Sequence, residues 1–127
     1  MINRVGQIMI YVNNQAEAVK FWTKKVGFVL IAEQGDGQGM RWFELAPTKD
    51  SETSIVLHNK ELVAKFQPEL NLGTPSLLFF SDRLDELYQD LSAKNVTVGE
   101  MVNMPTGEKV FNFADDEQNY FAVVEKR

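Results

Sequence analysis

The sequence predicts an α+β fold made of two tandem βαβββ modules, whose strands form a curved mixed β-sheet with a concave cleft. Residues 5–28 have the pattern of a strand, a capped helix and a glycine that ends the helix. The same order of elements recurs in the second half of the chain. The predicted caps Asn14 and Asp82, and the predicted helix ends Gly27 and Asn95, are both separated by 68 positions. A constant offset of this kind indicates an internal repeat.

The first module is predicted over residues 1–58. Its first strand alternates an aliphatic face (Ile8, Ile10, Val12) with a mixed face (Gln7, Met9, Tyr11). Asn14, with Glu17 three residues later, is typical of a helix N-terminus, and Gly27 is typical of a left-handed C-terminal residue. Strands then follow over 28–34, 40–46 and 53–58, with the glycine-rich stretch 35–39 as a hairpin turn.

The second module is predicted over residues 74–127, after a connector at 59–73. Within the connector, Leu62, Val63 and Phe66 indicate a short helical turn that ends before Pro68. A strand over 75–80 leads to a helix that Asp82 caps. Three strands follow, over 96–102, 108–114 and 120–125. We expect the two modules to form a single domain.

The offset also assigns residues to the two faces of the sheet. It pairs Phe43 with Phe111 and Leu45 with Phe113, so these side chains should pack beneath the helices. The same offset pairs Val12 with Phe80. The opposite phase carries Trp42, Glu44, Val110 and Asn112 together with the mixed face of the first strand. A twisted, helix-free sheet face with aromatic, thioether, amide and carboxylate groups is a candidate binding pocket.

Composition excludes several classes of protein. The chain of 127 residues has no cysteine, which excludes disulfides and thiolate metal sites. A net charge of −5 without a Lys/Arg cluster disfavours nucleic-acid binding. No apolar run is long enough to span a membrane, and the N-terminal residues lack the pattern of a signal peptide. We therefore expect a cytoplasmic protein.

Two stretches resemble the vicinal oxygen chelate superfamily, which includes glyoxalase I, extradiol dioxygenases, fosfomycin resistance enzymes and bleomycin resistance proteins. The first is IMIYVNNQAEAVKFWTKKVGF, which is similar to the family's strand, polar turn and helix followed by GF. The second is FNFADDEQNYFAVVE, which resembles its F-x-DP-x-G-N strand-turn-strand, with Asp116 and Gln118 in place of Pro and Gly. The resemblance implies the duplicated fold and a homodimer. It leaves open whether the cleft forms within one chain or across two.

The family's metal-ligand positions fall on Gln7, Ser54, Pro75 and Ala122 in this resemblance. Divalent-metal catalysis in the family needs three or four His, Glu or Gln donors, and only Gln7 qualifies. We therefore expect no cofactor and leave the catalytic residues unassigned. The alternative is a metal-dependent lyase, isomerase or dioxygenase with displaced ligands, for which Gln7, Glu44 and His58 are the donors that the chain offers. His58, the only histidine, is otherwise a strand-end imidazole.

The favoured hypothesis is a metal-free protein that binds a small aromatic or cationic molecule in the cleft, as bleomycin resistance proteins do. Tyr11 and Trp42 offer stacking or cation–π contacts, and Glu44 offers a carboxylate for a cation or a base. A regulatory or scaffold protein with a vestigial pocket is the third hypothesis. The predicted ligand-binding residues are Gln7, Met9, Tyr11, Trp42, Glu44, Ser54, Val56, Val110, Asn112, Tyr120 and Ala122.

Overall fold

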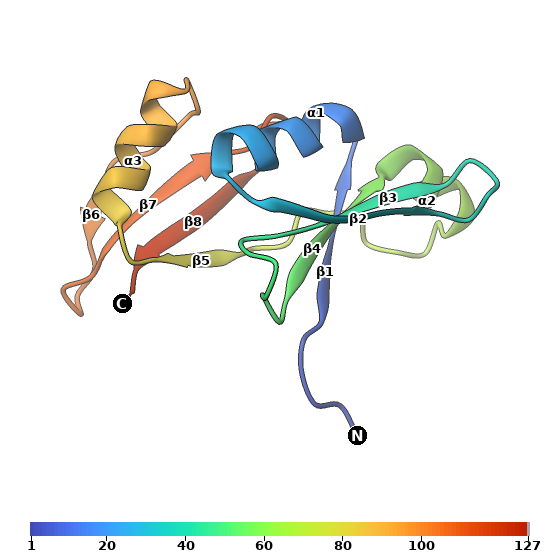
Figure 1. Cartoon of the computed structure of the whole chain (residues 1–127), viewed down its shortest axis with the longest axis horizontal. Helices are drawn as coiled ribbons and strands as arrows, with labels where there is room; N and C mark the ends of the chain where they lie inside the picture. The colour runs from blue at the N-terminus through green and yellow to red at the C-terminus, as the bar shows by residue number, and fades with distance from the viewer. Residues whose placement is uncertain (127) are drawn as a thin grey trace. The chain divides into compact units, whose positions relative to one another are not determined.

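The structure, a computed structural model, describes residues 1–126. The chain divides into two compact units, one from Met1 to Thr74 and one from Pro75 onward. Each unit contains one mixed four-stranded sheet and one βαβββ series of elements, so the predicted tandem fold is confirmed (Figure 1). Whether the two units behave as a single domain stays a prediction.

The first unit contains a sheet with the strand order β1-β4-β3-β2. Strand β1 runs parallel to β4, and the other neighbours are antiparallel. Helix α1 packs against β4 and continues into a π-helical turn, η1. The elements are β1 (Gln7–Val12), α1 (Gln15–Lys20), η1 (Phe21–Val26), β2 (Val29–Gly35), β3 (Arg41–Ala46), β4 (Ser54–Asn59) and α2 (Lys60–Phe66).

Local side-chain chemistry sets the helix ends of this unit. The side-chain oxygen of Asn14 accepts a hydrogen bond from the backbone N–H of Glu17 at 3.0 Å, which confirms the predicted cap. Gly27 has a φ of 92°, the left-handed conformation that glycine adopts without strain. Asn59 caps α2 in the same way, through the N–H of Leu62 at 3.1 Å. The helical turn predicted in the connector is therefore confirmed.

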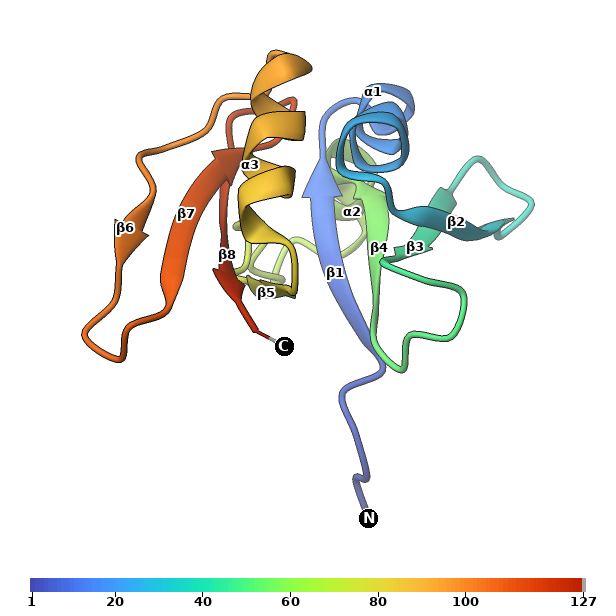
Figure 2. The same cartoon turned by 60° about the vertical axis from the view of Figure 1, so that its left-hand side comes forward.

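The second unit contains a sheet with the strand order β5-β8-β7-β6, again with one parallel pair, β5 and β8. Helix α3 packs against β8, and Figure 2 shows it lying along one side of this sheet. Asn95, which follows the C-cap residue Lys94, has a φ of 64°, as its predicted role requires. The elements are β5 (Leu78–Ser81), α3 (Leu84–Ala93), β6 (Val102–Asn103), β7 (Lys109–Ala114) and β8 (Tyr120–Glu125).

Three predictions for the second unit were wrong. Pro75 lies outside the strand, because β5 begins at Leu78. Asp82 is not the helix cap; Arg83 holds that position without a side-chain cap hydrogen bond. The strand expected over 96–102 is reduced to one bridge between Val98 and Phe113 and to the two-residue strand β6. Apolar residues in 96–102 produced the strand pattern, although most of this segment forms no ladder.

The repeat offset also fails at β5. Leu78 pairs with Ala122 as Gln7 pairs with Ser54, so Leu78 and not Pro75 is the structural counterpart of Gln7. Phe80, paired with Val12 by the offset, is 67% exposed on the helix-free side. Its neighbour Phe79 instead packs with the core aromatic rings of Phe113 and Phe121. A shift by an odd number of residues moves every side chain of a strand to the other face.

The faces predicted for β1, β3 and β7 are confirmed. Of the residues expected beneath the helices, Ile8 is partly buried, and the following are buried: Ile10, Val12, Phe43, Leu45, Phe111 and Phe113. Trp22, Leu84, Leu91 and Phe121 complete the two cores. Among residues 1–126, no helix has both the length and the apolar character needed to cross a membrane.

Candidate functional site

The side of the sheet in the first unit that faces away from α1, here called the open face, carries seven of the predicted binding residues. Strand pairing arranges them in three rows across β1, β4 and β3. Strand β4 lies in the centre, so its side chains have a neighbour on each side. The first row holds Gln7 and Ser54, the second Met9, Val56 and Glu44, and the third Tyr11, His58 and Trp42.

Glu44 is the centre of a polar cluster at one end of the open face. The Ser54 hydroxyl donates to Oε2 of Glu44 at 2.7 Å, the length of a strong hydrogen bond to a carboxylate. The Gln7 amide donates to the same oxygen at 3.4 Å, a long contact. Ser54 is only 6% exposed, so its hydroxyl is held in place by the surrounding strands. Within residues 1–126, no Lys or Arg forms an ion pair with Glu44.

Three rings line the other end of the open face. The imidazole of His58 stacks on Tyr11 with 5.7 Å between ring centroids, and the Trp42 ring lies 6.1 Å away on its other side. Nε2 of His58 lies 3.1 Å from the sulfur of Met9. Burial lowers the pKa of His58 below its usual value, because it disfavours the charged imidazolium. The imidazole is therefore neutral at pH 7 and belongs to an uncharged aromatic row.

A small apolar hollow opens beside the aromatic row, where α2 follows β4. Its volume is about 160 Å³. Sequence reasoning identified the helical spacing of α2 but not the side of the sheet that this helix borders, so it missed this hollow. The lining residues are Met40, Trp42, His58, Val63, Phe66 and Gln67.

The remaining predicted residues lie on the helix-free side of the sheet in the second unit. Asn112 pairs with Ala122, Val110 pairs with Val124, and Tyr120 shares the phase of Ala122. Leu78, Phe80 and Tyr120 are 55%, 67% and 57% exposed, so this side is markedly apolar. The ammonium of Lys126 lies 6.0 Å from the centre of the Phe80 ring.

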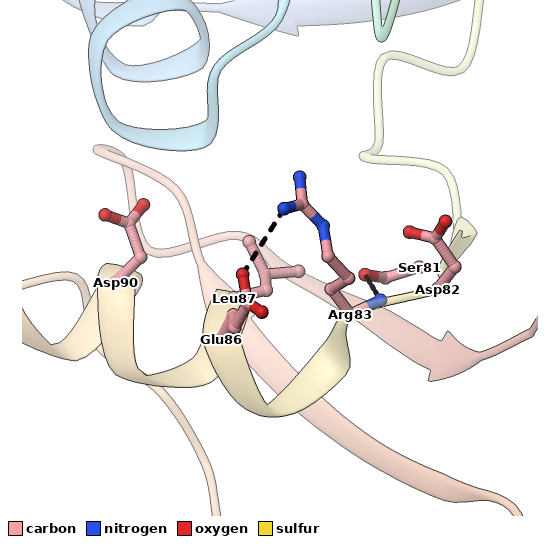
Figure 3. A pocket seen from close by; sticks show the side chains of 6 residues that line it. All are labelled: Ser81, Asp82, Arg83, Glu86, Leu87 and Asp90. Carbon is pink, nitrogen blue, oxygen red and sulfur yellow. Dashed lines mark hydrogen bonds and ion pairs between the residues drawn. The ribbon is translucent and has the colours of Figure 1, made fainter.

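Two other hollows are lined by residues that already pair with one another. At the start of α3, Arg83 forms an ion pair with Glu86 at 3.4 Å, and the carboxylates of Asp82 and Asp90 lie on opposite sides of that pair (Figure 3). On the helix side of the first unit, Arg41 is bound by Glu33 at 2.8 Å. Neither hollow contains a predicted binding residue.

The donors present do not fit the metal site that the fold family implies. Gln7 and Ser54 both donate to Glu44, and neither Ala122 nor Leu78, which takes the place expected for Pro75, has a side-chain donor atom. His58, the displaced ligand of the alternative hypothesis, lies in the aromatic row against Met9. In the part of the chain that the structure describes, no three His, Cys, Asp or Glu side chains converge as metal ligands would.

The comparisons with known proteins agree with this fold. The family model described as the Glyoxalase/Bleomycin resistance protein/Dioxygenase superfamily matches residues 4–123. The "Uncharacterized protein YetH" of Bacillus subtilis (strain 168) is 32% identical over 126 residues, covering 98% of this chain and 100% of that protein.

Two solved structures extend the similarity. The structure of TnmS3, described as an antibiotic binding protein from Streptomyces sp. CB03234, has a TM-score of 0.81 at 28% identity and covers 99% of this chain and 98% of its own. The structure of UcmS2 has a TM-score of 0.79 at 26% identity and covers 98% of both chains. With its duplicated βαβββ units and a family match over nearly its whole length, the chain belongs to the Glyoxalase/Bleomycin resistance protein/Dioxygenase superfamily.

Proposed function

We propose that this protein binds a small, partly aromatic molecule on the open face of its first unit, without a metal cofactor. The observation that carries the proposal is the position of Trp42 and His58, which belong both to the aromatic row and to the wall of the apolar hollow. Ring faces beside an apolar hollow, with a few polar groups nearby, are the usual composition of a small-molecule site. The similarity to TnmS3, described as an antibiotic binding protein, supports the same type of function.

A thermal-shift screen tests this function. A ligand that binds only the folded chain raises its melting temperature by mass action. We expect hits among planar aromatic compounds, and we expect Trp42→Ala to abolish their shifts. Val5→Ala is the matched control, because Val5 is an exposed apolar residue outside β1. A screen of aromatic antibiotics and simple arenes that yields no hit would overturn the proposal and favour a scaffold role.

We further propose that the protein forms a homodimer through the apolar side of its second sheet. The exposed side chains of Leu78, Phe80 and Tyr120 support this surface, because contiguous exposed apolar residues mark interaction sites. Light scattering after size-exclusion chromatography should give twice the mass of one chain. Phe80→Glu should reduce that mass to a single chain, and a wild-type protein that is monomeric at all concentrations would contradict the proposal.

A further inference from the structure

We infer that the ligand is an arylalkyl ammonium ion, whose cationic group pairs with Glu44 and whose ring lies against Trp42 and enters the hollow beside α2. This inference rests on the proposed function and adds the charge and shape of the ligand. It is carried by two features of the open face, a carboxylate that has neutral partners only and an apolar hollow that is one ring in size.

The carboxylate is arranged to accept a cation. Glu44 receives hydrogen bonds from the neutral groups of Ser54 and Gln7, both at Oε2, and no described Lys or Arg neutralises it. The carboxylate is half-buried, so less water would screen its attraction to a bound cation than at a fully exposed site. The nearest rings add no positive charge, because burial lowers the pKa of His58 and keeps its imidazole neutral at pH 7. The net charge of −5 also attracts cations.

The hollow sets the size of the apolar part. Its volume is about 160 Å³, and a dry apolar cavity of about 150 Å³ is known to accept benzene. Trp42 forms part of its wall, so a ring that enters there can also contact the indole face.

The strand geometry sets the distance between the two groups. Trp42 and Glu44 are alternate residues of β3, so their side chains point to the same side of the sheet. Their Cα atoms are separated by about 6.6 Å along the strand. A short alkyl arm between ring and ammonium spans that distance. Met9 and Val56 share the row of Glu44, next to the aromatic row, and would contact the arm.

Isothermal titration of the full chain tests the inference, with 2-phenylethylammonium and its neutral counterpart 2-phenylethanol as probes. We expect the cation to bind about 10-fold or more tightly than the alcohol, as a partly desolvated charge pair would give. Glu44→Gln should lower that preference to about 2-fold or less, because the isosteric amide has no charge. Glu33→Gln is the matched control, because it changes the net charge by the same amount. Glu33 forms an ion pair with Arg41 and lies on the opposite side of the sheet from the open face.

Phe66→Ala separates the contribution of the hollow. Phe66 lies in α2 at the hollow, so its removal should weaken the cation and the alcohol by similar factors. Equal affinity of the two probes for the wild-type chain would overturn the ammonium assignment and leave aromatic binding intact. The ammonium assignment also fails if Glu33→Gln reduces the preference as much as Glu44→Gln. Binding of neither probe, together with a silent thermal-shift screen, would overturn the proposed function itself.

Discussion

Removing the Ser54 hydroxyl should destabilise the first unit through its bond to Glu44. In Ser54→Ala the carboxylate loses its 2.7 Å donor and keeps only the long contact from Gln7. Hydrogen bonds to charged groups contribute about 1.5–3 kcal/mol, and we lower this to about 1–2 kcal/mol because Glu44 is only half-buried. For a chain of this length, that loss corresponds to a decrease in melting temperature of roughly 4–7 °C.

The assay is urea denaturation of Ser54→Ala, Glu44→Gln and the double variant. Glu44→Gln retains an oxygen acceptor for the Ser54 hydroxyl, so it should lower the free energy of unfolding less than Ser54→Ala does. The coupling energy between Ser54 and Glu44 from this double-mutant cycle should be about 0.5–1 kcal/mol. Gln7→Ala is the control, because a 3.4 Å exposed contact should contribute less than about 0.5 kcal/mol. A Ser54→Ala variant as stable as Gln7→Ala, with no coupling to Glu44, would refute the polar cluster.

Three further predictions concern the fold. In urea denaturation of dilute protein, Phe79→Ala should lower the free energy of unfolding by about 2–4 kcal/mol, because its ring packs with Phe113 and Phe121. Phe80→Ala should lower it by less than about 1 kcal/mol, because Phe80 is exposed. Equal losses would contradict the observed register of β5. Gly27→Ala should lower the free energy of unfolding by about 1–2 kcal/mol, because alanine is strained at a φ of 92°. Asn95→Gly should leave the stability unchanged or raise it. A Gly27→Ala variant as stable as the wild type would contradict the left-handed end of η1. The free energy of unfolding should fall as the pH drops below 6.5, the usual pKa of His, because His58 takes up a proton in the unfolded chain before it does in the folded chain. Urea denaturation at about pH 7.5 and 5.5 should show this loss in the wild type and not in His58→Phe.

Local signals predicted most of the first unit. The capping pair of Asn14 and Glu17 and the glycine at position 27 determine the helix through short-range hydrogen bonds and backbone sterics, which a sequence displays directly. The alternation in β1 fixes its two faces because one of them is buried. Gln7, Glu44 and Ser54 were all predicted on the binding face, and the structure brings them together in one cluster.

The second unit departs from the predictions where one module was used as a template for the other. Phe79 and Phe80 are chemically identical, so only the pairing of β5 with β8 decides which ring enters the core. Residues 96–102 are apolar enough for a strand, yet the ladder begins only at Val102 and ends at Asn103. Tertiary pairing, which a repeat offset does not encode, decides both cases.

The hollow beside α2 could not be predicted because it depends on a long-range arrangement. The spacing of Leu62, Val63 and Phe66 indicates a helix but not the side of the sheet that it approaches. Asn59 ends β4 and at once caps α2 through Leu62, so the helix begins directly at the end of the strand. The turn places Phe66 near Trp42, which is 24 positions earlier in the chain and on a different strand.

Ligand binding on the open face can be followed through the two indole N–H signals in a proton–nitrogen NMR spectrum during titration with 2-phenylethylammonium. The chain has two tryptophans, which serve as probe and internal reference. Trp42 lies on the open face at the hollow, and Trp22 is fully buried in the helix-side core. With assignment by Trp42→Phe, we predict a saturable shift of the Trp42 signal and a stationary Trp22 signal. A stationary Trp42 signal, or a shift confined to Trp22, would contradict ligand binding on the open face.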